Sequence, residues 1–182
     1  MGNDSSDQAL FSRIQAGDAQ AFRALVDTHS KPLITYVTRI LKNQSEAEEV
    51  VQEVFVRAWK NAGSYRPEAR ATTWLHHIAH NLAIDVIRKR RPNVSLEFED
   101  DPAPASTRPT ELLEQKQRAT SLKDALELLG ERQKMAMLLK YEQGLSGAEI
   151  GRVLDLSEDA VLSLLARARA KLVSILEPGR EP

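Results

Sequence analysis

Residues that could bind nucleic acid gather on one predicted helix near the middle of the chain. The segment TTWLHHIAHNLAIDVIRKRRP covers residues 72–92 and contains four consecutive basic residues, Arg88 to Arg91. At helical spacing, His77, Asn81 and Arg88 share one face. Cations bind phosphates, and an asparagine amide can pair with a base edge. A helix C-terminus also favours cations, but four in a row exceed that need, so the segment favours a nucleic-acid surface over a solvated helix end.

The same segment contains three histidines, which raise the question of a metal site. His76 and His80 lie four residues apart and could act as ligands. The chain has no cysteine, and Asp85 falls on a different helical face, so we expect no metal and no other cofactor. The glutamates of 46–60 lie on the outer face of an exposed helix, which argues against acid–base catalysis in a buried cleft. The sequence also has no glycine-rich loop that could bind phosphate. We therefore expect no catalytic residue and no enzymatic activity.

An apolar stripe predicts the buried side of the long helix. The stripe consists of Trp74, Leu75, Ile78, Leu82 and Val86. Trp74 could instead serve as a platform on which a base stacks, but its place in the stripe favours the core. Asp85 is placed to pair with Arg88 or Lys89, as a structural contact.

Composition limits the class of protein. The chain has 182 residues, of which 42% are hydrophobic and 28% charged, as in a soluble globular protein. Its net charge of −1 means that any nucleic-acid surface must be local. The absence of cysteine is typical of the reducing cytoplasm, and no apolar run is long enough for membrane insertion. We expect a cytoplasmic protein.

Apolar spacing is helical nearly everywhere, so the fold is predicted to be all-α. In the N-terminal part we expect a short helix, a second and a third helix, a fourth helix near 46–60 and the long helix from 72. The residues expected to start or end them are Gly17, Asp18, Pro32, the capping box Ser45 with Glu48, and Pro92. The apolar residues of the fourth helix are Val50, Val51, Val54, Phe55, Ala58 and Trp59.

Residues 92–110 interrupt this pattern with four prolines and an acidic cluster, which is typical of an extended linker. Beyond it we expect a helix from Leu112 to Leu129 closed by Gly130, and another closed by Gly144. A capping box of Ser146 with Glu149 begins a short helix, and a turn at Asp155–Leu156 leads to the N-cap Ser157 of the last helix. Two short helices joined in this way predict a helix-turn-helix.

Three segments together resemble a known family. DQALFSRIQAGDAQAFRALVDTHSKPLITYVTRIL and SEAEEVVQEVFVRAWKNAGSYRPEARATTWLHHIAHNLAIDVIRKRRP resemble region 2 of the extracytoplasmic-function (ECF) group of bacterial sigma-70 factors. ELLGERQKMAMLLKYEQGLSGAEIGRVLDLSEDAVLSLLARARAKL resembles their region 4. The resemblance implies two small helical domains, region 2 at 1–92 and region 4 at 111–177, joined by an acidic, proline-rich linker at 93–110 and followed by a tail at 178–182.

The resemblance also implies a function, partners and site residues. A sigma factor of this group binds core RNA polymerase, directs it to promoter DNA, and in many cases is controlled by an anti-sigma factor; the free protein is expected to be a monomer. The implied polymerase-binding residues are Glu49, Gln52, Glu53 and Arg57. Those implied for the −10 element, where one unpaired base is flipped out near the loop 64–70, are Ser64, Tyr65, Arg66, Arg70, His77, Asn81, Arg88, Lys89 and Arg91. Those implied for the −35 element are Ser157, Glu158, Asp159, Leu162, Ser163, Arg167 and Arg169.

The last helix departs from the family pattern. Leu162 and Leu164 stand where the family usually has cations, and Asp155 replaces the usual turn glycine, a tolerable change because aspartate accepts left-handed geometry. Residues 111–177 carry 11 acidic and 10 basic side chains. Three interpretations stay open: weaker or altered DNA recognition, a protein-binding face, or leucines covered by neighbouring helices. The rival functions are a DNA-binding regulator that does not bind polymerase and a sigma-like protein-interaction module.

Overall fold

The computed structural model describes residues 4–65, 69–90 and 122–177. Within them every regular element is helical, which confirms the all-α prediction. The described helices form two compact units, α1 to α4 in the first, and α6, α7 and most of the α8–α9 segment in the second. The predicted linker 93–110, the beginning of the helix expected from Leu112 and the tail 178–182 lie outside the described residues. No described helix is both long and apolar enough to cross a bilayer.

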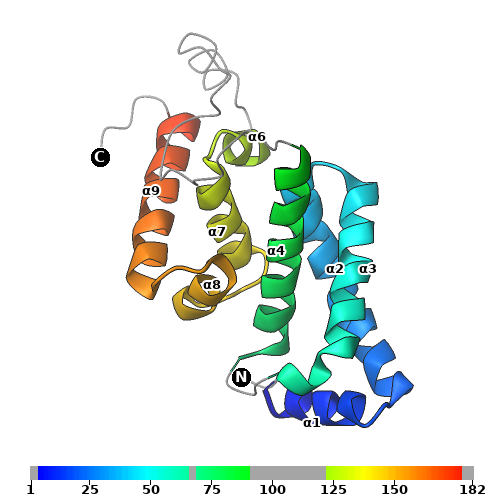
Figure 1. Cartoon of the computed structure of the whole chain (residues 1–182). Helices are drawn as coiled ribbons and strands as arrows, with labels where there is room; N and C mark the ends of the chain where they lie inside the picture. Colours follow the sequence, from blue (N-terminus) through cyan, green and yellow to red (C-terminus); the bar gives the residue numbers. More distant parts are fainter. Residues whose placement is uncertain (1–3, 66–68, 91–121, 178–182) are drawn as a thin grey trace. The chain divides into compact units, whose positions relative to one another are not determined.

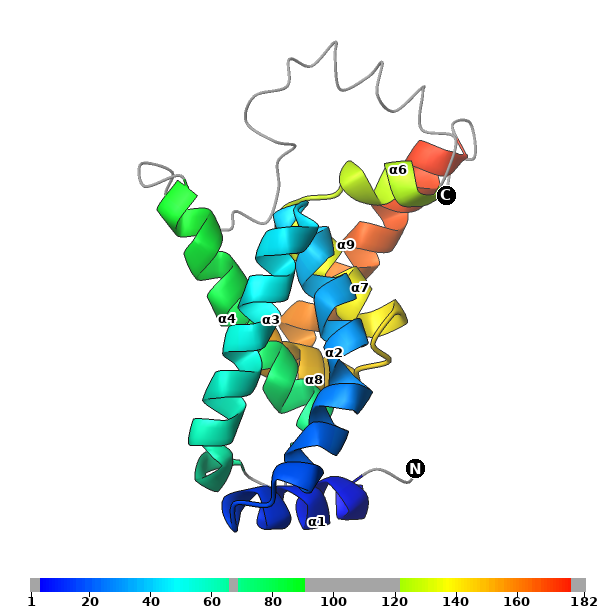
Figure 2. The same ribbon diagram turned by 90° about the vertical axis from the view of Figure 1, so that its right-hand side faces the viewer.

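The first unit is a bundle of three long helices with a short helix across one end (Figures 1 and 2). Its elements are α1 (Asp4–Gln15), α2 (Ala19–Leu41), α3 (Gln44–Lys60), the 3-10 turn η1 (Ala62–Ser64) and α4 (Ala71–Arg90). Helices α2, α3 and α4 all contact one another, and α1 contacts α2 and η1. Fully buried side chains from several helices, such as Leu25, Tyr36, Val54 and Leu75, form the core.

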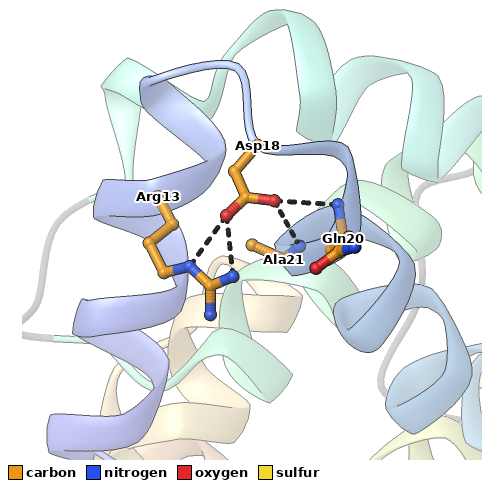
Figure 3. A network of polar contacts seen from close by, with 4 residues as sticks. All are labelled: Arg13, Asp18, Gln20 and Ala21. Atoms are coloured by element: carbon orange, nitrogen blue, oxygen red, sulfur yellow. Dashed lines mark hydrogen bonds and ion pairs between the residues drawn. The ribbon is translucent and has the colours of Figure 1, made fainter.

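Asp18 lies between α1 and α2 and is the N-cap of α2, as predicted. One carboxylate oxygen accepts hydrogen bonds from the backbone N–H groups of Gln20 and Ala21, at 2.9 and 3.1 Å. The other oxygen accepts from the Arg13 guanidinium of α1 at 2.9 and 2.7 Å (Figure 3). The Ala21 N–H, followed by Arg13, lowers the pKa of Asp18 below 3.8. Gly17 ends α1 with a φ of +85°, as predicted.

Two predicted helix starts in this unit are wrong. Pro32 lies inside α2 rather than at the beginning of a new helix. A proline removes one N–H donor, but the buried stripe continues on both sides of it, through Leu25, Leu33 and Tyr36, so tertiary packing holds the helix together. Helix α3 is capped by Asn43, whose side chain accepts from the Glu46 N–H at 3.3 Å, and not by the expected box of Ser45 and Glu48, which lie within the helix.

The described helices after the linker are α6 (Leu122–Glu127), α7 (Glu131–Tyr141), α8 (Gly147–Leu154) and α9 (Glu158–Leu176), and α9 packs against α6 and α7. Gly144 is left-handed, with φ +67°, and follows α7 as predicted. Gly130 differs from the prediction, because it is the N-cap of α7 at φ −61° and α6 already ends at Glu127. The Gln133 side chain accepts the Gly130 N–H at 3.4 Å, so local capping chemistry starts the next helix there.

The turn between α8 and α9 has the geometry of a helix-turn-helix. Ser146 and Glu149 form the predicted reciprocal capping box, at 2.8 and 3.3 Å. Asp155 adopts the expected left-handed conformation, with φ +53°, and the Ser157 hydroxyl accepts the Ala160 N–H at 3.2 Å. Gly151 is required by close approach, since a Cβ there would lie 2.5 Å from the Leu156 carbonyl oxygen. The polar contacts therefore fix where α9 begins.

The Asp18 cap can be tested by stability. We expect Asp18→Ala to lower the thermal midpoint at pH 7, because two N–H groups of α2 and Arg13 lose their acceptor. The pKa of Asp18 is lowered on folding, so its stabilisation is present above pH 3.8 and is lost as the pH falls through the lower pKa of the folded state. The difference between wild type and Asp18→Ala should therefore shrink below pH 3.8. Asp27→Ala, which changes an exposed carboxylate of α2, is the control; equal midpoints for both variants would contradict the assignment.

Candidate functional site

The four residues implied for polymerase binding lie together on the outward face of α3. Glu49, Gln52, Glu53 and Arg57 are all exposed, whereas Ala47, Val50, Val51, Val54 and Ala58 on the opposite side are buried. The Arg57 guanidinium donates to a Glu53 carboxylate oxygen at 2.8 Å, and about half of each side chain remains accessible. The amphipathic spacing of α3 thus produces a polar surface with both charges and an amide.

An apolar groove lies beside this polar face, between α2 and α3. It has a volume of about 610 Å³ and is lined by Ala19, Phe22, Val26, Gln52, Phe55, Val56, Trp59 and Lys60. Trp59 is 40% exposed and lies edge-on to Phe22, with ring centroids 4.9 Å apart. The signal for the groove is a second apolar row on α3, Val56 with Trp59, next to the buried row.

The residues implied for the −10 element on α4 share a face, as predicted. Asn81, Arg88 and Lys89 are exposed and His77 is half-buried. The Asn81 amide nitrogen lies 3.2 Å from His77 Nε2. Arg88 pairs with Asp85 at 3.8 Å, which confirms that expected contact. Arg91 lies outside the described residues.

Arg90 has a different role from its basic neighbours. Its guanidinium pairs with Glu46 of α3 and donates to the Leu41 carbonyl of α2 at 3.3 Å. These contacts join the end of α4 to the two other long helices of the bundle. Arg90 is therefore a structural cation, although the sequence places it in the same basic run.

His76 and His80 belong to the core of the first unit, being 1% and 8% exposed. His76 Nδ1 donates to the Thr72 carbonyl at 2.7 Å, and the Tyr36 hydroxyl lies at hydrogen-bond distance, 3.2 Å, from His80 Nδ1. Burial raises the pKa of Tyr36 far above its usual value, so the hydroxyl stays protonated. The described residues contain no cluster of three potential metal ligands.

The buried face of α4 is rotated from the predicted stripe. Leu75 and Leu82 are buried as expected, but Trp74, Ile78 and Val86 are only half-buried. Small and hydrogen-bonded residues take part of the core instead, namely Ala71, Thr73, His76, Ala79, His80 and Ala83. The hydrophobic pattern alone underestimated these positions because alanine contributes little to it and because histidine can be buried when it forms hydrogen bonds, as His76 and His80 do.

The loop between α3 and α4 contains further residues implied for the −10 element. Ser64 is exposed, and its hydroxyl donates to the Asn61 carbonyl at 2.7 Å. Arg70 is half-buried, and Arg66 lies outside the described residues. The Tyr65 ring is 6% exposed and stacks on Phe11 at 3.9 Å, with 15° between the planes. Trp74 lies edge-on to both rings, at 5.3 Å from Phe11 and 5.7 Å from Tyr65.

The residues implied for the −35 element are exposed on α9 and its cap. They are Ser157, Glu158, Asp159, Leu162, Ser163, Arg167 and Arg169. The two leucines that depart from the family pattern behave differently, because Leu162 is 52% exposed whereas Leu164 is 1% exposed. The idea that neighbouring helices cover these leucines therefore holds for Leu164 and is wrong for Leu162. One apolar side chain, not two, stands on the surface at these positions.

Two family models and several known proteins match this chain. Residues 25–92 match the model of sigma-70 region 2, and residues 119–172 match that of sigma-70 region 4. The RNA polymerase sigma-H factor of Pseudomonas aeruginosa is 32% identical over 98% of this chain and 97% of its own length. The ECF RNA polymerase sigma-E factor of Escherichia coli is 30% identical over 98% of both chains.

Two solved structures of sigma factors are similar to this chain. The structure of CnrH in complex with the cytosolic domain of CnrY is similar with a TM-score of 0.69 and 26% identity, over 96% of this chain and 99% of that one. The sigma factor RpoE of Bartonella quintana, solved with the anti-sigma factor NepR, shares the fold with a TM-score of 0.65 at 21% identity, over 89% and 100% of the two chains. Because both sigma-70 regions are matched in order along nearly the full length of these relatives, the chain belongs to the ECF group of sigma-70 factors, which are transcription initiation factors.

Proposed function

We propose that this protein is an alternative sigma factor that acts in the cytoplasm, binds core RNA polymerase as a monomer and directs it to a defined set of promoters. The observation that carries the proposal is the exposed face of α3 with Gln52, Glu53 and Arg57, next to the groove at Trp59. A DNA-binding regulator that works without polymerase would not need this surface. None of the proposed roles requires a catalytic residue.

The face of α3 and the groove together have the composition of a protein interface. Stable interfaces combine an apolar centre, often with an exposed tryptophan, with a polar rim. Here the groove residues Phe22, Val56 and Trp59 supply the apolar part, and Gln52 with the Glu53–Arg57 pair supplies the rim. We propose that a helical segment of the largest polymerase subunit lies across this surface, with its apolar side in the groove.

The outward face of α4 is proposed to contact the −10 element. Arg88 and Lys89 supply positive charge for phosphates, and Asn81 supplies an amide that can pair with a base edge. Recognition of a base that has left the stack offsets part of the cost of unstacking. Ser64 is exposed in the loop between α3 and α4 and is proposed to contact such a base.

Helix α9 is proposed to contact the −35 element, with a chemistry changed from that of the family. Arg167 and Arg169 are exposed and can approach phosphates. The exposed side chains nearest the start of the helix are Glu158, Asp159 and Leu162, which can accept from cytosine or contact a thymine methyl group but cannot bind phosphate. Weaker electrostatic binding of the −35 region is the expected consequence.

Control by an anti-sigma factor is proposed on the basis of the solved relatives. CnrH, 26% identical to this chain, was solved in complex with the cytosolic domain of CnrY. A partner of this kind is proposed to cover the apolar groove and the exposed part of α9, because each of these surfaces carries exposed large apolar side chains, among them Val56, Trp59 and Leu162. The identity of such a partner does not follow from this chain.

The polymerase face can be tested by a pair of matched substitutions in the first unit. We expect Glu53→Ala to weaken binding to core polymerase about threefold, mainly through a lower association rate, since a charged group in the rim of the contact is removed. Asp27→Ala removes the same charge from an exposed position of α2 outside the groove lining and should leave binding unchanged. Binding is measured by titrating core polymerase against the labelled full chain, and the thermal midpoints verify that both variants fold. Equal affinities for the two variants would place the polymerase elsewhere.

Promoter direction can be tested by transcription in vitro from a library of randomised promoters with core polymerase and the full chain. We expect transcripts to begin at sites that share two short elements separated by a constant spacing, and to disappear when the protein is omitted. A protein that binds core polymerase and yields no dependent start site would not be a promoter-directing factor.

The exposed leucine of α9 provides a test of the −35 surface. We expect Leu162→Lys to raise affinity for duplex DNA and to increase the slope of log K against log salt by about one, because one more phosphate is neutralised. Val173→Lys adds the same charge to an exposed position about 16 Å further along the helix, and should have a smaller effect. If the slope for Leu162→Lys equals that of the wild type, this part of α9 does not approach the phosphates.

A further inference from the structure

Helix α1 contacts both ends of the loop between α3 and α4, which begins with η1. The residues that make these contacts are Asp7, Phe11 and Gln15. They are spaced by four residues, so they lie on one face of the helix and extend over about 12 Å along its axis. None of them belongs to the polymerase face or the DNA-binding residues implied by the family resemblance.

Gln15 holds the leading end of the loop. Its amide nitrogen donates to the Ala62 carbonyl of η1 at 2.9 Å. Ala62 itself is buried, and the η1 turn continues through Ser64 to Tyr65, whose N–H donates back to the Ala62 carbonyl at 3.2 Å. The Ala62 carbonyl therefore accepts both from within the turn and from α1, which fixes the turn relative to α1.

Phe11 holds the next part of the loop through its ring. It is 1% exposed and stacks on Tyr65, and Trp74 of α4 closes the cluster edge-on. Stacked and edge-to-face pairs add directional attraction to the burial of apolar area. Tyr65 is thereby held by α1 and α4 together, immediately after the exposed Ser64.

Asp7 holds the far end of the loop at the beginning of α4. Its carboxylate is buried, with 6% exposure of the residue, and accepts the Ala71 N–H at 3.3 Å. A carboxylate at a helix N-terminus interacts favourably with the helix dipole. The charges of Asp7 and Arg70 both act on His29 of α2, whose pKa is lowered by burial, raised by Asp7 and lowered by Arg70. The four elements α1, α2, the loop end and α4 therefore meet at Asp7.

We propose that α1 keeps the two ends of this loop at a fixed separation and orientation, a role that we call the brace. Asp7, Phe11 and Gln15 are then positioning residues for recognition of the −10 element. Tyr65 contributes through its stack on Phe11, which orients Ser64, rather than by direct contact with a base. This inference rests on the proposed function, since it assigns to α1 control over how the −10 bases are discriminated.

The alternative is that α1 only adds stability to the first unit. The two possibilities differ in one measurable quantity. A variant that is merely less stable has a smaller active fraction, which lowers transcription from every promoter by the same factor. A variant with a displaced loop changes the ratio between promoters that differ in a −10 base, and this ratio is independent of the active fraction.

Gln15→Met is the decisive variant, because Gln15 lies at an exposed position and methionine retains its length without the N–H donor. Gln8→Met makes the same change at another exposed position of α1 and is the matched control. Both are assayed as full chains with core polymerase on the randomised promoter library. For Gln15→Met we expect the ratio of transcription between the preferred and the other −10 bases to fall at least about threefold. A loss of this size is within the discrimination that one specific base pair usually provides. Preferences at −35 and affinity for core polymerase should equal those of the wild type.

Asp7 provides a second, independent variant. Asp7→Ala removes the acceptor for the Ala71 N–H and should also reduce −10 discrimination, whereas Asp7→Asn retains an oxygen acceptor and should restore most of it. If Asp7→Asn behaves as Asp7→Ala does, the hydrogen bond to Ala71 is not what positions the loop, and that part of the proposal is wrong.

The outcomes separate the brace from the proposed function. If the wild type shows no promoter preference at all, the proposed function fails. If the wild type discriminates at −10 and Gln15→Met has the same base ratios as Gln8→Met, the brace is overturned and α1 only stabilises the fold. Equal flattening at −10 and −35 would also overturn it, because the loop at 62–71 would then not be the affected element.

Discussion

The mutual packing of α2, α3 and α4 is the interaction on which the first unit depends. Each helix buries one side, at Tyr36, Val54 and Leu75 among others, and each thereby presents its opposite side to solvent. The polar face of α3 and the outward face of α4 are consequently held in a constant relation by one shared core. A polymerase contact and a DNA contact can then be made on the same bundle without any element having to move, so binding energy is not lost in ordering them.

Local chemistry made much of the fold predictable from sequence. Asp18 and Ser157 cap their helices as expected because a short oxygen side chain before a helix bonds to its first N–H groups. Asp155 adopts the left-handed turn expected of it. Tertiary context decided the rest. The predicted helix start at Pro32 is wrong because packing maintains one helix through it. The sequence left the exposure of Leu162 and Leu164 open, and packing covers Leu164 but not Leu162.

The candidate surfaces were predictable to a different degree. The spacing of α3 and α4 placed the implied contact residues Gln52, Glu53, Asn81 and Arg88 on exposed faces, since helical periodicity needs no partner to be inferred. For the apolar groove, the sequence shows only the second apolar row of α3, Val56 with Trp59. Its other wall comes from α2, so the groove itself forms only where the two helices meet. The contacts of α1 with the loop were hidden for the same reason, as residues far apart in sequence come together only in the folded bundle.

The contacts of Arg90 affect how many cations at the end of α4 can contribute to electrostatic binding of DNA. A guanidinium already bound to Glu46 and to the Leu41 carbonyl has exchanged its mobile counterion for fixed partners. It has no counterion to release when DNA arrives, and counterion release is the source of the electrostatic part of DNA affinity. The number of counterions that this run could release on DNA binding is therefore smaller than its formal charge. The last turn of α4 connects the helices of the bundle and also forms part of the proposed nucleic-acid surface.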